Sequence, residues 1–384
     1  MAMPVFSLYC FCMFVLCCDT VLNPVSALQS CDFPAIFNFG DSNSDTGGLP
    51  AAFNWTNPPY GETSFHMPAG RYSDGRLIID FIATSLGLPF LSAYLNSLGT
   101  NFTNGANFAT GASTTAPPHS VIPVGRYSPF YLDAQYWQFA QFIYRSQIIK
   151  KTGAIYKNLM PEEEYFQKAL YTFDIGQNDL DHGFSSNMSM EEVNASVPEI
   201  VNRFSTNIKN IYKLGARSFW IHNTGPIGCL PYILATFPAA QIDSAGCARP
   251  YNEVAQYFNY RLKMAIVQLR KDLPLAAITY VDVYSVKYSL YTEPQKYGFE
   301  HLHVACCGYG GKYNFSSVGN CGDTVSVNGS KIFIGSCERP SARVNWDGFH
   351  YTEAANKFVF DRISPGEFSD PPIPLSMACH SKLD

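Results

Sequence analysis

The stretch Pro34-Ala35-Ile36-Phe37-Asn38-Phe39-Gly40-Asp41-Ser42 decides how this chain is interpreted. It begins as a short, mostly apolar run and ends in turn-forming residues, which is the pattern of a buried strand that enters a polar turn. Leu170 to Phe173 repeats the pattern and opens into Asp174-Ile175-Gly176-Gln177-Asn178-Asp179. Two such strands predict a sheet whose carboxyl edge carries polar side chains, with Ser42 among them.

Strand-like and helix-like segments alternate along the rest of the chain, which is typical of a parallel sheet flanked by helices. We expect helices at 76–86, 193–214, 252–273 and 352–363, and strands at 218–222 and 278–283. Three long segments without predicted structure, at 49–72, 114–131 and 308–343, are rich in Gly, Pro, Asn and Ser. Loops of that length are often functional in compact domains. No linker separates two cores, so we expect one domain over residues 28–384.

The composition agrees with one extensive core. Of the 384 residues, 47% are hydrophobic and 15% are charged, which excludes an intrinsically disordered chain. The net charge of −5, with no long run of one sign, gives no basic surface of the kind that nucleic-acid binding requires. We therefore expect no nucleic-acid partner, and the sequence leaves the oligomeric state open.

Residues 1–27 are similar to a secretory signal peptide. The apolar run Val5–Leu16 is followed by the small-residue site Val25-Ser26-Ala27, after which cleavage is expected. Polar residues interrupt the apolar run before it reaches the length of a membrane span, so a short membrane anchor is the less favoured alternative. The sequence predicts a secreted protein without stable membrane insertion, located outside the cell or in the cell wall, with the vacuole as an alternative.

Eight cysteines remain after such a leader: Cys31, Cys229, Cys247, Cys306, Cys307, Cys321, Cys337 and Cys379. An even number in a secreted chain predicts disulfides, although spacing does not give their connectivity. The adjacent Cys306 and Cys307 cannot easily pair with each other without strain, so each should pair elsewhere. His301 and His303 raise a zinc site as an alternative. We disfavour it and expect no metal, because no second pair of ligands has finger-like spacing.

Asn-x-Ser/Thr acceptor sequences support the same compartment, because N-glycosylation takes place on secreted chains. The six acceptors are Asn54, Asn101, Asn187, Asn194, Asn314 and Asn328. We expect a glycoprotein in which some of these acceptors are unused.

Three separated segments carry the residues of a serine hydrolase. A serine hydroxyl needs a base that takes its proton and donors that stabilise the oxyanion formed on the substrate. Ser42 follows a strand, where a helix N-terminus stabilises anionic charge. Asp347 precedes His350 by three residues, a spacing that lets the carboxylate orient the imidazole. For the oxyanion, the amide of Asn178 and the backbone N–H of Gly105 are candidates, although each of these segments taken alone is more often an ordinary turn.

Taken together, these segments resemble the plant GDSL esterase/lipase family, within the SGNH hydrolases. The resemblance rests on four motifs, which are Phe37 to Gly47, Gly105 to Ala109, Gly176 to Asp179 and Asp347 to His350. It extends to Gly70 to Arg76 and Cys306 to Gly311, and the residues near His350 are most similar to the early-nodulin-like acetylesterase branch. The Gly-x-Ser-x-Gly signature of α/β-hydrolases is absent.

The resemblance implies a three-layer, flavodoxin-like α/β sandwich with a central parallel sheet. It also implies that Ser42 is the nucleophile and first oxyanion donor, Gly105 and Asn178 are the other donors, His350 is the base and Asp347 orients it. For Arg71, Asp74 and Arg76, which lie in another family motif, we expect a structural ion pair and a helix start.

We therefore expect a secreted esterase that forms an acyl-enzyme and needs no cofactor or metal. Its substrates should be small-molecule or carbohydrate esters, in particular short acyl (acetyl) groups on glycosides or cell-wall carbohydrate. Two alternatives remain at this point: an acyltransferase that uses the same acyl-enzyme, and a secreted carbohydrate-binding or defence-related glycoprotein.

Overall fold

The computed structural model describes residues 30–53, 56–153 and 155–380. The expected signal peptide and the acceptor Asn54 lie outside the described residues. The chain divides into two units, Met1–Ser30 and Cys31–Asp384, and the second carries all the elements below.

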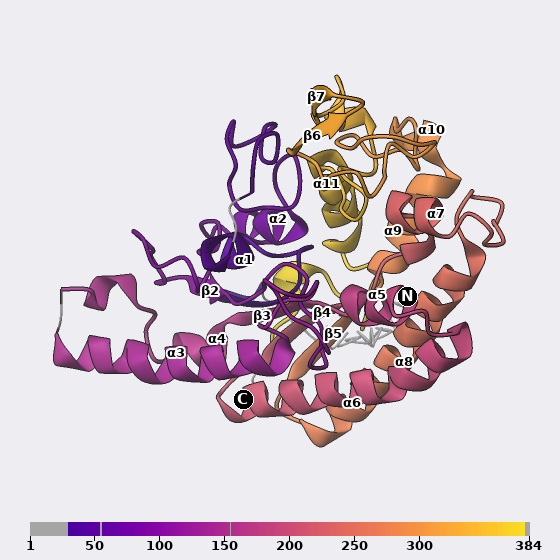
Figure 1. Cartoon of the computed structure of the whole chain (residues 1–384). Coiled ribbons are helices and arrows are strands. Elements are labelled where there is room, and N and C mark those ends of the chain that lie inside the picture. The colour runs from indigo at the N-terminus through magenta and orange to yellow at the C-terminus, as the bar shows by residue number, and fades with distance from the viewer. Residues whose placement is uncertain (1–29, 54–55, 154, 381–384) are drawn as a thin grey trace, which may run out of the picture. The chain divides into compact units, whose positions relative to one another are not determined.

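A six-stranded sheet forms the centre of this unit (Figure 1). Its strands, in chain order, are β1 (Ile36–Gly40), β2 (Gly105–Asn107), β3 (Leu170–Asp174), β4 (Ser218–His222), β5 (Ala277–Val281) and β8 (Ser369–Asp370). The spatial order is β2-β1-β3-β4-β5-β8, and every pairing is parallel except that of β5 with β8. The order 2-1-3-4-5 is that of flavodoxin-like sheets, in which ligands bind where the strand order reverses, here between β1 and β3.

Helices cover both faces of the sheet, which gives the expected three layers (Figure 1). Successive residues of a strand point to opposite faces. Accordingly, Phe37 and Phe39 pack with α3 (Leu132–Thr152), α6 (Met190–Lys213) and α8 (Arg249–Asp272) in one cluster. Ile36 packs on the other face with α2 (Ile78–Ser85), α9 (Val283–Thr292) and α11 (Glu353–Ile363). The predicted fold class is confirmed.

The helices follow from local sequence signals. In α6, the buried residues Val193, Val197 and Ile200 recur at helical spacing, and Ser189 and Glu192 form a capping box at its start. Helix α11 begins after Thr352, whose side chain accepts a hydrogen bond from the backbone N–H of Ala355. The smaller helices are α1 (Gly48–Ala52), α4 (Tyr165–Lys168), α5 (Gln177–Ser185), α7 (Pro231–Thr236) and α10 (Pro294–Tyr297), with short 3₁₀ turns at Lys157–Leu159, Ile227–Cys229, Pro340–Ala342 and Leu375–Met377.

Several elements differ from the sequence-based prediction, among them β2, α3 and the hairpin of β6 (Thr324–Val327) and β7 (Ser330–Phe333). Strand β2 occupies the segment that we had interpreted as a donor turn, because three residues are too few to show a period. Helix α3 was not predicted, and it has a weak apolar face: Trp137 and Tyr144 are exposed. The hairpin lies within the expected loop 308–343.

All eight cysteines form disulfides, so this prediction is confirmed. The pairs are Cys31–Cys379, Cys229–Cys247, Cys306–Cys337 and Cys307–Cys321. Cys306 and Cys307 each pair elsewhere, as expected. Because both sulfurs are consumed by disulfides, they are not available as the thiolate ligands of the alternative zinc site.

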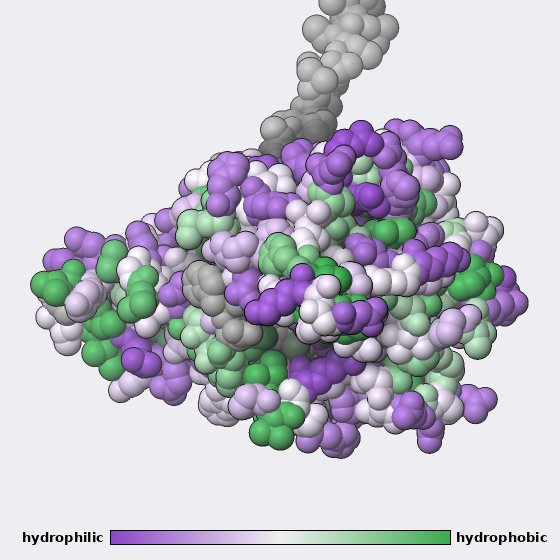
Figure 2. All heavy atoms as spheres, turned by 45° about the horizontal axis from the view of Figure 1, so that its top comes forward, coloured by the Kyte–Doolittle hydropathy of each residue, from purple (hydrophilic) through white to green (hydrophobic). Residues whose placement is uncertain are grey.

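The surface mixes polar and apolar residues. On the face shown in Figure 2, hydrophobic residues occur in small groups among hydrophilic ones. Isolated apolar residues on a surface are normal. Within residues 30–53, 56–153 and 155–380, no helix combines the length and apolar character that a bilayer crossing requires.

Candidate active site

Ser42, His350 and Asp347 lie together at the carboxyl edge of the sheet. Ser42 follows β1, whereas Asp347 and His350 lie in the loop before α11. Nε2 of His350 is 2.7 Å from Oγ of Ser42, and Nδ1 of His350 is 2.8 Å from Oδ2 of Asp347. In this arrangement the serine hydroxyl donates to the imidazole, and the imidazole donates to the carboxylate. It can transfer a proton from Ser42 to His350 and stabilise the imidazolium that results.

A tight turn fixes the position of Asp347 relative to His350. Oδ1 of Asp347 accepts hydrogen bonds from the backbone N–H groups of Phe349 at 2.7 Å and His350 at 2.9 Å. The ring of Tyr72 stacks on the imidazole at 5.3 Å between centroids. Burial alone raises the pKa of Asp347, but the charge of His350 and the hydrogen bonds to the carboxylate outweigh it and lower that pKa. Asp347 therefore stays ionised beside the histidine.

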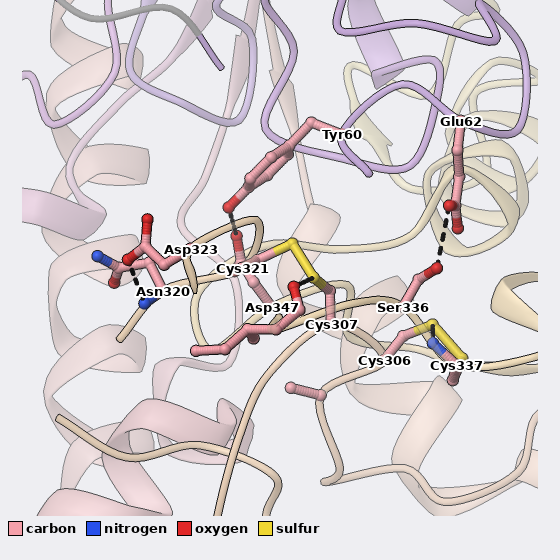
Figure 3. Close-up of a disulfide and its surroundings, with 12 residues drawn as sticks. Tyr60, Glu62, Cys306, Cys307, Asn320, Cys321, Asp323, Ser336, Cys337 and Asp347 are labelled. Carbon is pink, nitrogen blue, oxygen red and sulfur yellow. Dashed lines mark hydrogen bonds between the residues drawn. A yellow bond between two sulfur atoms is a disulfide. The ribbon is translucent and has the colours of Figure 1, made fainter. Parts of the chain in front are cut away.

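Tyr60 completes the contacts of Asp347. Its hydroxyl donates a hydrogen bond of 2.9 Å to Oδ2 of Asp347 (Figure 3). Burial and the charge of Asp347 raise the pKa of Tyr60 well above its ordinary value, so the phenol stays protonated as a donor. The sequence analysis missed Tyr60, because it lies in the long segment 49–72 with no signal that joins it to Asp347.

Two disulfides support the segment that precedes Asp347. The backbone N–H of Cys306 donates to the carbonyl of Asn345 at 3.0 Å, and that of Cys307 donates to the carbonyl of Trp346 at 2.6 Å. Cys307 is joined to Cys321 close to Tyr60 and Asp347 (Figure 3). The adjacent cysteines thus fix the chain directly before the acid residue.

Two of the three expected oxyanion donors, Ser42 and Asn178, line the same pocket. The backbone N–H of Ser42 has no acceptor among the described residues. Asn178 lies at the start of α5, directly after β3, and its side-chain nitrogen uses one proton on the carbonyl of Ser113 at 2.9 Å. The second proton of that amide has no acceptor among the described residues. Both residues line a pocket of about 170 Å³ together with His350.

The prediction for Gly105 is wrong. Gly105 begins β2 and is paired with Ile36, at the opposite end of β1 from Ser42. Its N–H donates to the carbonyl of Phe102 at 3.0 Å. With a φ of +109° and a Cβ position only 1.8 Å from the carbonyl oxygen of Ile36, glycine is required there for packing. The motif is a strand start rather than a donor turn.

The turn after β2 provides a different backbone amide. Ala112 lines the pocket that contains Ser42, has a left-handed φ of 59°, and its N–H has no acceptor among the described residues. The preceding N–H, of Gly111, is already bound by Oδ2 of Asp45 at 2.7 Å. The signal in the sequence was Gly111, which follows the end of β2. Ser42 and Asn178 likewise follow the ends of β1 and β3.

A buried charged cluster lies beneath Ser42. Oδ2 of Asp174 is 3.0 Å from Nδ1 of His222, and Lys287 is buried among Asp174, Asp41 and the ring of Tyr351. Burial and the charge of Asp174 raise the pKa of Asp41, whose Oδ2 has no hydrogen-bond partner within the described ranges. Burial lowers the pKa of Lys287, and the charges of Asp174 and Asp41 offset only part of this decrease. The protonation of each of these groups therefore depends on the charge of its neighbours.

Arg71, Asp74 and Arg76 have the structural roles that we expected. Arg71 forms an ion pair of 2.7 Å with Asp80 of α2, and Arg76 forms one of 2.7 Å with Glu353 at the start of α11. Asp74 accepts a hydrogen bond from the backbone N–H of Glu353. They join the two helices beside the site.

The five described glycosylation acceptors fall into two groups. Asn101, Asn187 and Asn328 are exposed. In contrast, the side-chain nitrogen of Asn314 donates to the carbonyl of Ala305 at 2.9 Å, and Oδ1 of Asn194 is buried with no partner among the residues that the structure describes. A glycan on Asn314 would replace one of the two protons of that nitrogen, which leaves a single N–H for the bond to Ala305.

The fold and these residues define a serine hydrolase that acts on carboxylic esters. Residues 36–363 match the model of the GDSL-like lipase/acylhydrolase family. The chain belongs to that family.

Named relatives cover almost the whole chain. An esterase from Hevea brasiliensis is 66% identical, over 96% of this chain and 93% of its own. The GDSL esterase/lipase ENOD8 of Medicago truncatula is 60% identical, over 96% and 94%. The resemblance to the early-nodulin branch is thereby confirmed. A protein of Arabidopsis thaliana named alpha-L-fucosidase 3 is 53% identical, over 96% and 97%.

Solved structures of similar proteins are more distant. Phospholipase A1 from Streptomyces albidoflavus is 13% identical, with a TM-score of 0.35, over 85% of this chain and 96% of its own. A catalytic mutant of an acetylxylan esterase from Geobacillus stearothermophilus is 10% identical, with a TM-score of 0.32, over 68% and 80%.

Proposed function

We propose that the protein is a secreted esterase that removes short acyl groups, acetyl above all, from glycosides or cell-wall carbohydrate, with Ser42, His350 and Asp347 as its catalytic triad. The observation that carries the proposal is the continuous chain of hydrogen bonds from Ser42 Oγ through His350 to Asp347. This geometry activates a hydroxyl that would otherwise be a weak nucleophile.

The reaction proceeds through an acyl-enzyme. Oγ of Ser42 attacks the ester carbonyl while Nε2 of His350 takes its proton, and the imidazolium then returns that proton to the leaving alcohol. The negative oxygen is stabilised by the N–H groups of Ser42 and Ala112 and by the side-chain amide of Asn178. Water, activated by His350, releases the acid and regenerates Ser42. All proton transfers use groups of this chain.

Two cavities on either side of His350 support the proposed substrate class. The pocket with the oxyanion donors is small, about 170 Å³, and apolar residues such as Leu49, Ile227 and Leu230 line it. A second cavity of about 390 Å³ shares His350 and also contains Asn57, Asn320 and Asp323. The carbonyl must lie beside the donors, so the acyl group occupies the small pocket. The larger, more polar cavity suits an alcohol of glycoside size.

Secretion is part of the proposal. Four disulfides are typical of proteins from oxidising compartments, and residues 1–27 have the pattern of a signal peptide. Among the described acceptors, Asn101, Asn187 and Asn328 are the ones we expect to carry glycans, because they are exposed.

Hydrolysis of nitrophenyl esters from acetate to palmitate, by the purified secreted protein and by Ser42→Ala, tests the proposal. We expect turnover of the short esters, and a loss of at least about 10⁴-fold in the variant. Acetylated xylan and acetylated glycosides should then release acetate. Activity that survives in Ser42→Ala would overturn the nucleophile, and exclusive activity on palmitate would overturn the substrate class.

A further inference from the structure

Arg126 stands between two cavities. It lines the pocket of about 170 Å³ that contains Ser42, and it also lines an outer groove of about 720 Å³. Tyr232 and Phe349 are the other two residues that both cavities share. These three side chains therefore form the partition between the acyl pocket and the outer groove. The groove itself is bounded by residues such as Phe315 and Asn320.

We infer that Arg126 is a specificity-determining residue that ends the acyl pocket and limits the length of the acyl chain the enzyme accepts. The inference rests on the proposed function, since it assigns the pocket beside the oxyanion donors to the acyl group. It adds the residue that sets the limit and the cavity that a longer chain would need.

Several contacts hold Arg126 in the partition. Its guanidinium forms an ion pair of 3.1 Å with Oδ2 of Asp181, and it lies 5.1 Å from the ring centroid of Tyr232 and 5.8 Å from that of Phe349. A guanidinium is weakly hydrated and stacks well on aromatic rings, so it can serve as a wall as well as a charge. The hydroxyl of Tyr127 donates to the same carboxylate oxygen at 3.0 Å.

The charge balance favours a wall over an anion-binding site. Asp181 is almost fully buried, with a side chain that is 10% exposed, and it neutralises Arg126. Its other oxygen, Oδ1, accepts no hydrogen bond from the described part of the chain. If Arg126 moved aside for a long chain, a buried carboxylate would lose its cation, which is costly. Arg126 is thus held in place from the side of α5, the helix that also carries Asn178.

The size of the inner pocket sets the expected limit. A cavity of about 150 Å³ holds a ligand the size of benzene, so the pocket beside Ser42 accommodates an acyl group of up to roughly six carbons. Longer chains would have to pass the partition into the outer groove. Removal of the Arg126 side chain joins the two cavities without touching the hydrogen bonds of Ser42, His350 and Asp347.

The test is the ratio of kcat/KM for nitrophenyl decanoate to that for nitrophenyl acetate. We expect wild-type protein to strongly prefer acetate and Arg126→Ala to raise the ratio by at least about tenfold, the effect of a small change in apolar pocket contacts. Arg126→Met, which keeps the length of the side chain without its charge, should stay near the wild-type ratio. Arg145→Ala, which removes an exposed arginine of α3, is the matched control.

An unchanged ratio in a folded Arg126→Ala protein, or equal wild-type activity on both esters, would overturn the partition. A shift as large in Arg126→Met as in Arg126→Ala would overturn its steric role. If the wild type hydrolyses no ester at all, the proposed function is wrong, and the inference that rests on it fails too. If the wild type hydrolyses acetate esters but Arg126→Ala leaves the ratio unchanged, only the inference fails. Should Arg126→Ala fail to fold, as thermal melting would show, wild-type labelling decides. A methylphosphonate nitrophenyl ester should then label Ser42 at least about tenfold faster than a decylphosphonate, and equal rates would overturn the inference.

Discussion

The hydroxyl of Tyr60 donates a hydrogen bond of 2.9 Å to Oδ2 of Asp347, although 287 positions separate the two residues in sequence. The same oxygen accepts from Nδ1 of His350 at 2.8 Å. Tyr60 therefore acts on the histidine through the acid residue. It is a positioning residue, because its hydroxyl reaches His350 through Asp347.

Tyr60→Phe should lower kcat by roughly tenfold, because a hydrogen bond to a charged group contributes about 1.5 kcal/mol. KM should change little, because the ring of Tyr60 that lines the larger cavity is kept and only the hydroxyl bound to Asp347 is lost. Steady-state kinetics on nitrophenyl acetate measure both constants. Tyr144→Phe, in which a tyrosine with 65% exposure loses its hydroxyl, is the control. A rise in KM with an unchanged kcat would contradict this role.

Asn178→Ala should lower kcat by about 10²-fold or more, since loss of one oxyanion donor has an effect of this order. KM for a short ester should stay close to the wild-type value, because the amide acts on charge that develops in the transition state. Stopped assays of acetate ester hydrolysis give both values, with the exposed Asn158→Ala as control. A purely structural role for Asn178 would instead show as a lower melting temperature with little change in kcat.

Gly105→Ala should destabilise the protein instead of removing a catalytic donor. The added Cβ would lie 1.8 Å from the carbonyl oxygen of Ile36, at a φ of +109°. We expect a loss of more than about 3 kcal/mol, or failure to accumulate folded protein. Gly87→Ala is the matched control, because Gly87 also has a positive φ of +71° but nothing within 4 Å of a Cβ. It should lose only about 1–2 kcal/mol.

Thermal melting of the two glycine variants decides between these roles. If Gly105→Ala melts like the wild type and loses only kcat, then Gly105 would be a donor after all, and its pairing with Ile36 could not describe the active protein.

Asp41→Asn should make the stability of the protein less dependent on pH. Burial and the charge of Asp174 raise the pKa of Asp41 above its unfolded value of 3.8. The folded state then binds more protons than the unfolded state, so the free energy of unfolding falls as pH rises through this window. Asparagine has no proton to lose, and its oxygen can still accept the hydrogen bonds from Asn43.

Melting temperatures of the wild type and of Asp41→Asn at pH 5 and pH 8 test this sign. Between pH 5 and pH 8 the variant should become more stable relative to the wild type by about 1–3 kcal/mol. Each kcal/mol corresponds to a rise in relative melting temperature of a few degrees. A relative loss over the same interval would mean that the pKa of Asp41 is lowered in the folded protein.

The sequence by itself determined the layered α/β class and the neighbourhood of the nucleophile. Buried strands such as Leu170–Asp174 show as short apolar runs, and long helices such as α6 show as periodic apolar residues, because such periodicity acts within a few residues. The turn after β1 and the three-residue spacing of Asp347 and His350 are local in the same sense. They identified the segments that meet at Ser42.

Only the tertiary structure decided which groups face one another across the site. Gly105 looked like a donor in isolation, but the register of β2 against Ile36 places it at the far end of the sheet, and Ala112 lies in the pocket instead. Tyr60 and Arg126 come from long loops whose conformations depend on contacts with Asp347 and Asp181. Such contacts join residues far apart in sequence, and their positions depend on packing and strand register, which leave no periodic pattern in the sequence itself.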